Sequence, residues 1–378
     1  MKTVRSVFVI GLVIGGTFTG LARAQDPEFH YLQGGHLEGV SFIDSNRGWT
    51  VEDGARIRYT TNAGANWTFA ATPNTPATWV QLNGIFVLDV STNGNNHVKV
   101  WAVGDNGVVL VSTDNFGQVF SDANEGARIT NKVGEGDPCE PVGQLARLHD
   151  IFMFDELHGW VVGEDGVLMR TDDGGETWED APTPPWVMEC GEDPYDAYDI
   201  HFFSDSSYEK GIIASEFGKI FRTDDGGDSW SVVSATGGLP SICPELGFDP
   251  ELDSNLEFWG MDFADPADPD SEMWLSGGVG TSVGYVFKHS SAWGAEPETW
   301  TQLRCYDFLN PSQIDGAGTC SLSTMYSLSM LNPSNNRVLI AGYAGQLFDW
   351  LTGTADFDPC ECDVGQPSEC GTNVPSWI

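Results

Sequence analysis

The sequence predicts an all-β fold, a β-propeller of six four-stranded blades, with seven blades possible. Three observations lead to this prediction. Six similar units recur at intervals of roughly 50–65 residues, a spacing typical of propellers. An acidic, glycine-rich turn that closes on tryptophan is written almost identically at 170–178 and 222–230. The chain also contains 45 glycines and 20 prolines, which favour many turns over long helices.

The six units share one internal order of short apolar runs and polar turns. They cover 37–69, 82–120, 148–178, 197–230, 256–300 and 325–350. In the third unit, apolar runs at 150–154, 159–163 and 167–170 are separated by polar or glycine-containing turns. The acidic turn follows, and Trp178 begins a fourth run. Short β-rich runs broken by Gly/Asp turns are hairpin signals, so each unit is interpreted as one four-stranded blade.

The repeated turn is interpreted as a structural lock. An aspartate in the turn accepts backbone N–H groups, glycine adopts the positive φ that the turn requires, and the tryptophan buries a large ring between blades. The four turns that fit this pattern contain Thr60, Asn62, Gly64 and Trp67; Ser112, Asp114, Gly117 and Phe120; Thr171, Asp173, Gly175 and Trp178; and Thr223, Asp225, Gly227 and Trp230. The fifth unit clearly keeps only Trp300, and the sixth lacks the turn.

These turns resemble the Asp box, or bacterial neuraminidase repeat, with the pattern S/T-x-D-x-G-x-x-W/F. The longer phrase "GWVVGEDGVLMRTDDGGETW" resembles the propellers of the photosystem II assembly factor family, over roughly residues 37–350. That resemblance implies a noncatalytic scaffold whose boxes are structural. A basic patch binds partners in photosynthetic members, but this chain has only 17 Lys and Arg, so that partner is not transferred.

The N-terminus predicts export. Residues 1–24 have a basic start, an apolar core and the Ala-Arg-Ala sequence expected before signal cleavage. The predicted organisation is therefore a signal peptide at 1–24, the propeller at 25–359 and a cysteine-containing tail at 360–378, in a secreted or periplasmic protein. Cleavage would remove three basic residues and no acidic one, moving the net charge from −38 to −41.

The charge and hydropathy also restrict the partners. A strongly acidic chain repels nucleic acid, which excludes a nucleic-acid partner, and no later run is apolar enough to cross a bilayer. The expected partner is a protein or a glycan, and the expected state is a monomer.

All eight cysteines follow the predicted signal. An even count in an exported chain predicts disulfides whose connectivity the sequence does not define. The candidates are Cys139, Cys190, Cys243, Cys305, Cys320, Cys360, Cys362 and Cys370. One hypothesis pairs cysteines of adjacent inter-blade links, for example Cys139 with Cys190.

No cofactor is expected, and calcium is the one metal that the sequence brings into question. The acidic boxes lack the spacing of an EF-hand. A better cation candidate is the stretch 262–272, although a solvated acidic insertion is the preferred interpretation. Its hard oxygen ligands would be Asp262, Asp265, Asp268, Asp270 and Glu272.

No catalytic residue is assigned. A sialidase needs converging arginines, a tyrosine nucleophile and acidic partners, and no arginine lies in the setting that opens sialidase propellers. Other glycosidases need only two carboxylates across a cleft. Among 55 Asp and Glu some pair always seems suitable, so this signal is weak. A carbohydrate-active enzyme or a glycan-binding propeller stays the alternative to the scaffold.

Strand direction divides the predicted turns between two faces. Because strands alternate within a blade, first-to-second and third-to-fourth turns share one face, here named the box face. The boxes and the 262–272 loop lie there. The link face carries the second-to-third turns and the inter-blade links. It should therefore hold Glu52, Asp53, Asp105, Glu164, Asp165, Glu216 and the five cysteines from Cys139 to Cys320. Binding residues concentrate in such loops. Closure of the ring is expected from a strand near 29–33.

Overall fold

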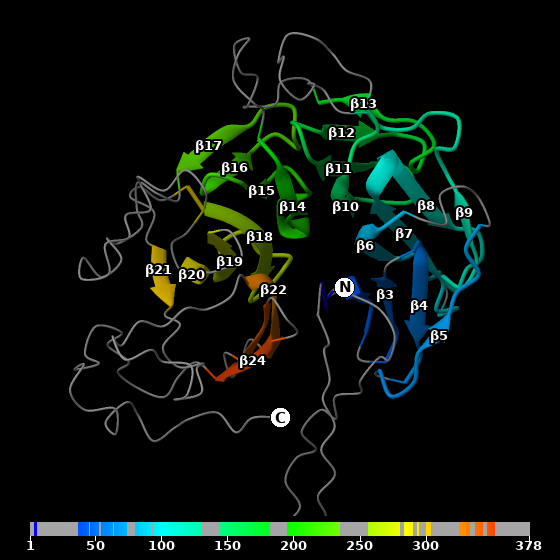
Figure 1. The fold of residues 1–378 in the computed structure, drawn as a ribbon, viewed down its shortest axis with the longest axis horizontal. Helices are drawn as coiled ribbons and strands as arrows, with labels where there is room; N and C mark the ends of the chain where they lie inside the picture. The colour runs from blue at the N-terminus through cyan, green and yellow to red at the C-terminus, as the bar shows by residue number, and fades with distance from the viewer. Residues whose placement is uncertain are drawn as a thin grey trace, which may run out of the picture.

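The computed structural model confirms an all-β propeller, and Figure 1 shows its sheets arranged around a common axis. The structure describes residues 4–5, 37–130 without 45, 53, 63, 74–79 and 93, and then 144–181, 195–234, 256–279, 283–289, 293–294, 300–303, 325–332, 337–342 and 346–351. All eight cysteines, the 360–378 tail and the expected closing strand near 29–33 lie outside these residues.

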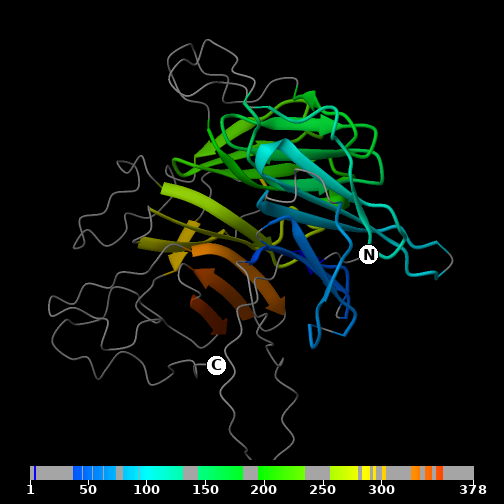
Figure 2. The same cartoon turned by 45° about the vertical axis from the view of Figure 1, so that its right-hand side comes forward.

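Each sheet is a simple meander in which consecutive strands pair antiparallel (Figure 2). The first sheet contains β1 (Val4–Arg5), β2 (Leu37–Phe42), β3 (Gly48–Glu52), β4 (Arg56–Thr60) and β5 (Thr68–Phe69). The second contains β6 (Leu82–Asp89), β7 (Val98–Gly104), β8 (Val108–Ser112) and β9 (Phe120–Asp122). The third contains β10 (Leu148–Met153), β11 (Gly159–Gly163), β12 (Leu168–Thr171) and β13 (Glu179–Asp180).

The remaining sheets follow the same plan. The fourth contains β14 (Ala197–Phe202), β15 (Gly211–Ser215), β16 (Lys219–Thr223) and β17 (Ser231–Ser234). The fifth contains β18 (Leu256–Phe263), β19 (Met273–Val279), β20 (Val283–His289) and β21 (Trp300–Leu303). The last contains β22 (Met325–Asn332), β23 (Arg337–Gly342) and β24 (Gln346–Leu351). Two 3₁₀ turns, η2 (Asp105–Gly107) and η3 (Ser204–Ser206), complete the elements described.

The predicted blade number is wrong. The described residues form five complete blades with at least four strands, followed by a three-stranded sheet, rather than six or seven complete blades. The sequence contains the reason, because in the complete second, third and fourth blades the fourth strand follows a box. The sixth unit has no box, and its last described strand ends at Leu351.

The inner strand of every sheet carries a register shift near its start. The shift lies between Leu148 and Asp150 in β10 and between Ala197 and Asp199 in β14, and the other inner strands repeat it. A β-bulge leaves one extra residue unpaired and re-aims its side chain. The residues within these shifts in the five complete blades are Glu38, Asn83, His149, Tyr198 and Trp259. Each blade therefore presents one variable side chain at the same end of its inner strand.

Tryptophans on second strands join consecutive blades. The indole N–H of Trp49 donates to the carbonyl of Gly117, in the box of the next blade, at 2.7 Å. Trp101 donates likewise to Gly174 at 2.8 Å. Both indoles are buried, at 2% and 0% exposure. Burial of such a ring together with its hydrogen bond gives a dry, specific contact. The box is thus half of an inter-blade joint, and the preceding blade supplies the other half.

The joint between the fourth and fifth blades is reversed. In the fourth blade Gly211 pairs with Thr223, and this register puts Ile212 at the position that Trp160 has in the third blade. In the fifth blade Met273 pairs with His289. Trp293 comes four residues after His289, as Gly227 comes four residues after Thr223, so Trp293 is at the position of the box glycine. The large ring and the small residue have exchanged sides. Trp293 packs against the core cluster that contains Ile212. In the fifth unit, a tryptophan therefore stands at the position that glycine occupies in the boxes.

Inner strands are also joined by carboxylates that accept backbone N–H groups of the next blade. Asp150 accepts from Ile200 at 3.2 Å, and Asp199 accepts from Met261 at 2.8 Å. Around them the core is assembled mainly from the first, second and third strands of neighbouring blades. Among the residues described, no helix has the length and apolar character to cross a membrane.

Candidate functional site

The boxes form closed hydrogen-bonded turns. In the third blade the amide of Gly175 donates to the Thr171 hydroxyl at 3.0 Å, and Asp173 accepts from the amide of Thr177 at 2.9 Å. The hydroxyls of Thr171 and Thr177 also donate to Asp173. These bonds hold the pKa of Asp173 below its usual range, against the opposing effect of partial burial. The carboxylate oxygens are used inside the turn.

The other boxes repeat this pattern with one variation. Thr223, Asp225 and Gly227 make the same bonds in the fourth blade, and Thr60 with Asn62 makes them in the first. In the second blade, Asp114 accepts from Gln118 and Val119, while the Ser112 hydroxyl accepts from Val100 of β7.

The closing aromatics of the boxes differ in their environment. Trp230 is buried and meets Trp160 of the preceding blade, with ring centroids 6.3 Å apart. Trp178 is half-buried, and its indole donates to Gly175 within its own box at 3.1 Å. Phe120 is buried at the start of β9, and Trp67 meets Phe42 edge-on at 6.0 Å.

The candidate cation loop on the same face uses its acidic groups for turns and packing. Asp265 and Asp268 each accept the backbone amide two residues ahead. Asp270 accepts the amide of Trp293, and Glu272 pairs with Lys288 and accepts the indole of Trp274. Asp262 is buried in β18 at 6% exposure. Within the described residues, no three His, Cys, Asp or Glu side chains are grouped to hold a metal ion.

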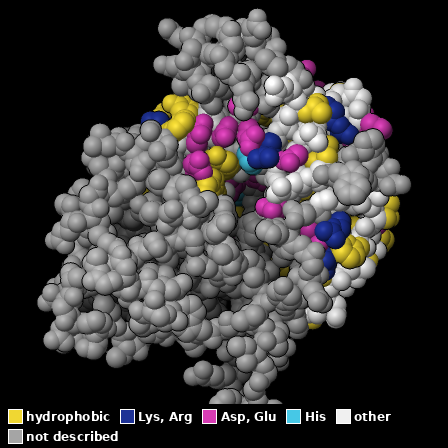
Figure 3. Space-filling model, viewed as in Figure 1, with side chains coloured by type: hydrophobic (Ala, Val, Ile, Leu, Met, Phe, Trp, Pro, Cys, Tyr) yellow, Lys and Arg dark blue, Asp and Glu magenta, His cyan; other side chains and the backbone are white. Residues whose placement is uncertain are grey.

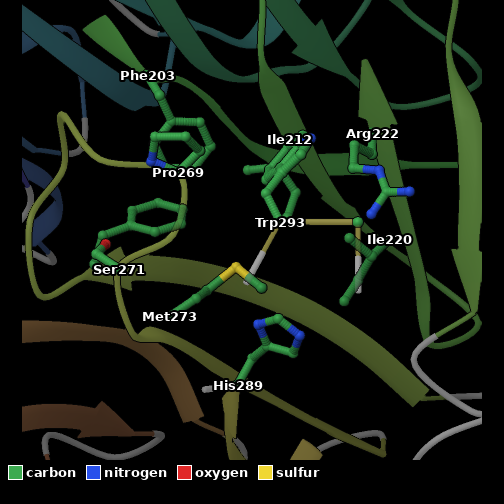
Figure 4. Close-up of a pocket in the computed structure, with 11 residues that line it drawn as sticks. Phe203, Ile212, Ile220, Arg222, Pro269, Ser271, Met273, His289 and Trp293 are labelled. Atoms are coloured by element: carbon green, nitrogen blue, oxygen red, sulfur yellow. The ribbon is translucent and has the colours of Figure 1, made fainter. Parts of the chain in front are cut away.

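A pocket lies at the reversed joint (Figure 4). Its walls include Phe203, Ile212, Ile220 and Met273, and His289 and Arg222 provide polar groups. Trp293 lies at 5.3 Å from the Arg222 guanidinium and donates its indole N–H to Asp224 of the fourth box at 2.6 Å. Because Trp293 binds both Asp224 and Asp270, the predicted placement of the box and the 262–272 loop on one face is confirmed.

The link face holds a denser group of ionisable residues, here named the acidic rim. Its members come from four consecutive blades, the second to the fifth, and they are Asp105, Glu164, Asp165, Asp196, Glu216 and Glu257. Asp196 accepts the amide of Asp165 at 2.8 Å, and its own amide donates to Glu216 at 2.9 Å. Figure 3 shows acidic side chains gathered above the centre of the view, beside hydrophobic ones.

One arginine serves the first part of the acidic rim. Arg147 pairs with Asp105 at 2.9 Å and with Glu164 at 3.0 Å. It therefore bridges the second-to-third turns of two blades, which confirms that these turns share the link face. Glu52, predicted there as well, pairs with Arg58 in its own blade, and Asp53 lies outside the described residues.

The rest of the acidic rim is poorly solvated and crowded by like charge. Burial and the charges of Glu164, Asp165 and Glu257 raise the pKa of Asp196 to about 7. Burial and the neighbouring carboxylates also raise the pKa of Glu216 to about 7, and burial raises the pKa of Glu257. Like charges held close in a low-dielectric setting disfavour ionisation. Asp196 and Glu216 therefore take up protons more readily near neutral pH than ordinary carboxyl groups do.

An aromatic row borders these carboxylates, formed by the bulge residues His149, Tyr198 and Trp259. The ring centroids of His149 and Tyr198 are 4.9 Å apart, and those of Tyr198 and Trp259 are 6.3 Å apart. Burial and Arg147 lower the pKa of His149 to about 3, so this imidazole is neutral, and its 3.8 Å approach to Glu164 is not an ion pair. The bulge has placed three rings from three blades side by side.

The chemistry of this row differs from that of a sialidase centre. Burial, followed by the charges of Asp196, Glu257 and Glu216, raises the pKa of Tyr198 above its usual range. An activated phenol nucleophile needs the opposite shift. Among the described residues, Arg147 is the arginine paired with acidic-rim carboxylates. The arrangement is suited to holding positive charge beside aromatic surfaces.

Sequence reasoning placed part of this site. It assigned Asp105, Glu164, Asp165 and Glu216 to the link face but singled out neither Asp196 and Glu257 nor the aromatic row. Aligning the units on their first strands would have placed His149, Tyr198 and Trp259 in one column. The register shift that turns these side chains toward one another has no clear sequence signature.

These features define the class of protein: a BNR-type β-propeller that resembles the photosystem II assembly factors. A family model described as photosynthesis system II assembly factor YCF48 matches residues 141–246. The photosystem II assembly lipoprotein Ycf48 of Synechococcus sp. (strain CC9902) is 33% identical over 91 residues, which are 24% of this chain and 25% of that protein. The match thus spans about a quarter of that curated relative.

Two solved structures with TM-scores above 0.5 share this fold at low identity. A GH74 enzyme from Niastella koreensis has a TM-score of 0.51 and 14% identity, with 83% of this chain and 44% of that chain covered. An ancestral GH74 enzyme has a TM-score of 0.51 and 13% identity over 85% of this chain and 38% of the other. A structure of YCF48 bound to a D1 peptide has a TM-score of 0.41 and 18% identity, covering 84% and 94%.

Proposed function

We propose that this chain is a noncatalytic propeller that works outside the cytoplasm, secreted or periplasmic, as a protein-binding or assembly scaffold. The observation that carries the proposal is the link face, where acidic and aromatic side chains from successive blades lie in contact. Box-face carboxylates such as Asp173 and Asp225 are instead used inside their own turns. The family description, an assembly factor, favours a protein over a small substrate as the partner.

Export is supported by the sequence of residues 1–24 and by the chain's low number of basic residues, 17 against 55 acidic ones. A mature protein that begins at Gln25 and is found in the secreted or periplasmic fraction would support this part of the proposal. A full-length chain in the cytoplasm would contradict it.

The scaffold proposal is tested by affinity capture from the producing cell. One bait carries two link-face reversals, Asp105→Lys and Glu216→Lys, and a matched bait carries two box-face reversals, Glu156→Lys and Asp228→Lys. All four side chains belong to turns, which keeps the core intact. We expect partners to be lost from the first bait and retained by the second. Equal capture by both baits would refute a role for the link face.

A carbohydrate-active enzyme is the competing function. The observation that favours it is the raised pKa of Asp196 and Glu216, since a glycosidase needs one carboxyl group that is protonated near neutral pH. The test is hydrolysis of a panel of aryl glycosides and polysaccharides. Turnover that disappears in Asp196→Asn or Glu216→Gln, with the fold retained, would replace the scaffold by the enzyme.

A further inference from the structure

The aromatic row has the geometry of a surface that receives positive charge. Tyr198 and Trp259 come from adjacent inner strands, and their rings meet edge to face at 85°. Burial raises the pKa of Tyr198 and of Glu257, and a side-chain hydrogen bond with Trp259 opposes that rise in each case, so this indole contacts both neighbours. All three side chains are partly exposed. The face of an aromatic ring attracts ammonium and guanidinium groups, most strongly for tryptophan.

Among the described residues, the carboxylates beside these two rings form no ion pair with a lysine or an arginine. Arg147 is paired with Asp105 and Glu164, at the far end of the acidic rim. Across the part of the chain that the structure describes, no Lys or Arg forms an ion pair with Asp196, Glu216 or Glu257. Some other acidic groups do have a cationic partner, as Glu272 has in Lys288 at 2.6 Å. Within the described chain, no cation therefore balances the carboxylates near Tyr198.

We propose, resting on the proposed scaffold function, that Tyr198 and Trp259 together with Asp196, Glu216 and Glu257 bind a lysine or arginine side chain in a basic segment of the partner protein. The rings contact the charged end and the stem of that side chain, and the carboxylates accept its N–H groups. Charge-assisted hydrogen bonds of this kind are stronger than neutral ones. The partner is thereby defined as a protein with an exposed basic segment.

Binding is coupled to protonation. A bound cation favours the ionised carboxylates, so it lowers the pKa of Asp196 and Glu216 from about 7 and releases protons. Affinity should therefore increase as pH rises from 6 to 8. The charged and titratable groups that face Asp196 and Glu216 from neighbouring elements are Glu164, Asp165, Tyr198 and Glu257, and none of them is a cation.

The binding test uses a synthetic dodecapeptide of alternating lysine and serine and the same peptide with every lysine acetylated. Titration calorimetry is performed on the mature chain at pH 8 and pH 6. We expect the lysine peptide to bind about tenfold more tightly at pH 8, and the acetylated peptide to bind at least tenfold more weakly. Equal binding of the two peptides would overturn the proposal, as would an affinity that does not change between these pH values.

Variants separate this site from general attraction to an acidic chain. Tyr198→Leu and Trp259→Leu should each weaken binding by about 3–30-fold, the range expected for one cation–π contact. Tyr198→Phe keeps the ring and should bind like the parent, which separates loss of the ring from loss of the hydroxyl, and circular dichroism checks that each variant is folded. Glu156→Gln removes an exposed carboxylate of the box face and should have no effect. Identical affinities for Tyr198→Leu and the parent would overturn the role of the row.

The same variants separate the failure of this inference from failure of the scaffold proposal. If native partners are lost from the link-face reversal bait but kept by Tyr198→Leu and Trp259→Leu, the scaffold stands and the cation site is refuted. If the link-face reversal bait also keeps its partners, both the cation site and the role of the link face in the scaffold proposal are refuted.

Discussion

Among the box glycines of the inter-blade joints, Gly227 leaves the least room for a side chain. Its φ is +95°, and a Cβ added there would lie 2.4 Å from Cζ2 of Trp160 in the preceding blade. The adjacent Gly226 has a φ of +74° but would meet nothing closer than the carbonyl of Tyr208, at 3.7 Å. The two glycines share the backbone requirement, and only Gly227 makes room for the indole.

Gly227→Ala and Gly226→Ala therefore form a matched pair. A non-glycine residue in the left-handed region costs about 1 kcal/mol, which both variants incur. Gly227→Ala also forces Trp160 or the box to move, and overpacking of this kind costs about 1–3 kcal/mol. We expect the free energy of unfolding to fall by about 1 kcal/mol for Gly226→Ala and by about 3 kcal/mol for Gly227→Ala.

The assay is urea unfolding followed by tryptophan fluorescence and by far-UV circular dichroism, whose coincidence checks two-state behaviour. A third variant, Trp160→Phe, removes the part of the indole that lies nearest to Gly227. In the double variant with Gly227→Ala the losses should be less than additive by at least about 1 kcal/mol. Equal losses for the two glycine variants, or additive losses in the double variant, would refute the joint as described.

Three further predictions concern other parts of the ring. Ile212→Trp should lower the melting temperature because a second indole meets Trp293, and adding Trp293→Gly should recover part of the loss by restoring the arrangement of the other joints; no recovery would contradict the reversal. The raised pKa of Asp196 and Glu216 means that the folded state binds more protons than the unfolded state between about pH 4 and 7, so stability should fall as pH rises through 7. Urea midpoints at pH 5 and 8 measure this loss, and Asp196→Asn should reduce it; an unchanged difference would contradict the burial of Asp196. Thr171→Val should cost about 1 kcal/mol because the buried amide of Gly175 loses its acceptor, whereas Thr177→Val at an exposed position should cost less; calorimetric melting compares the two, and equal effects would contradict the buried turn bond.

The sequence was informative where structure is local. Alternating apolar runs, turn glycines and the box letters are short-range signals, and they gave the strand order within blades and the two faces. The number of complete blades was missed because the sixth unit repeats three runs without the box that precedes a fourth strand. The partners of the boxes were missed for a different reason. Trp49 and Gly117 are 68 residues apart, and nothing in either segment identifies the other.

The candidate site was only half visible for a physical reason. Asp196 and Glu257 acquire their raised pKa from burial and from neighbours in other blades, which a linear sequence does not display. The column of His149, Tyr198 and Trp259 was present in the repeats, but its meaning depends on the bulge. A single extra residue in the inner strand decides whether these rings enter the sheet or line the rim.

The exchange of Trp and Gly between the fourth and fifth blades restricts the order in which the blades can be arranged. The third blade presents the indole of Trp160 to the fourth blade, and the fifth blade presents the indole of Trp293 to the same blade from the other side. Placing the fifth blade directly after the third would therefore bring two indoles into one space. Duplicating or moving single blades should therefore destabilise the ring when the change brings these two kinds of joint together. A propeller that is to be enlarged or circularly permuted should be opened at a joint other than the one between the fourth and fifth blades.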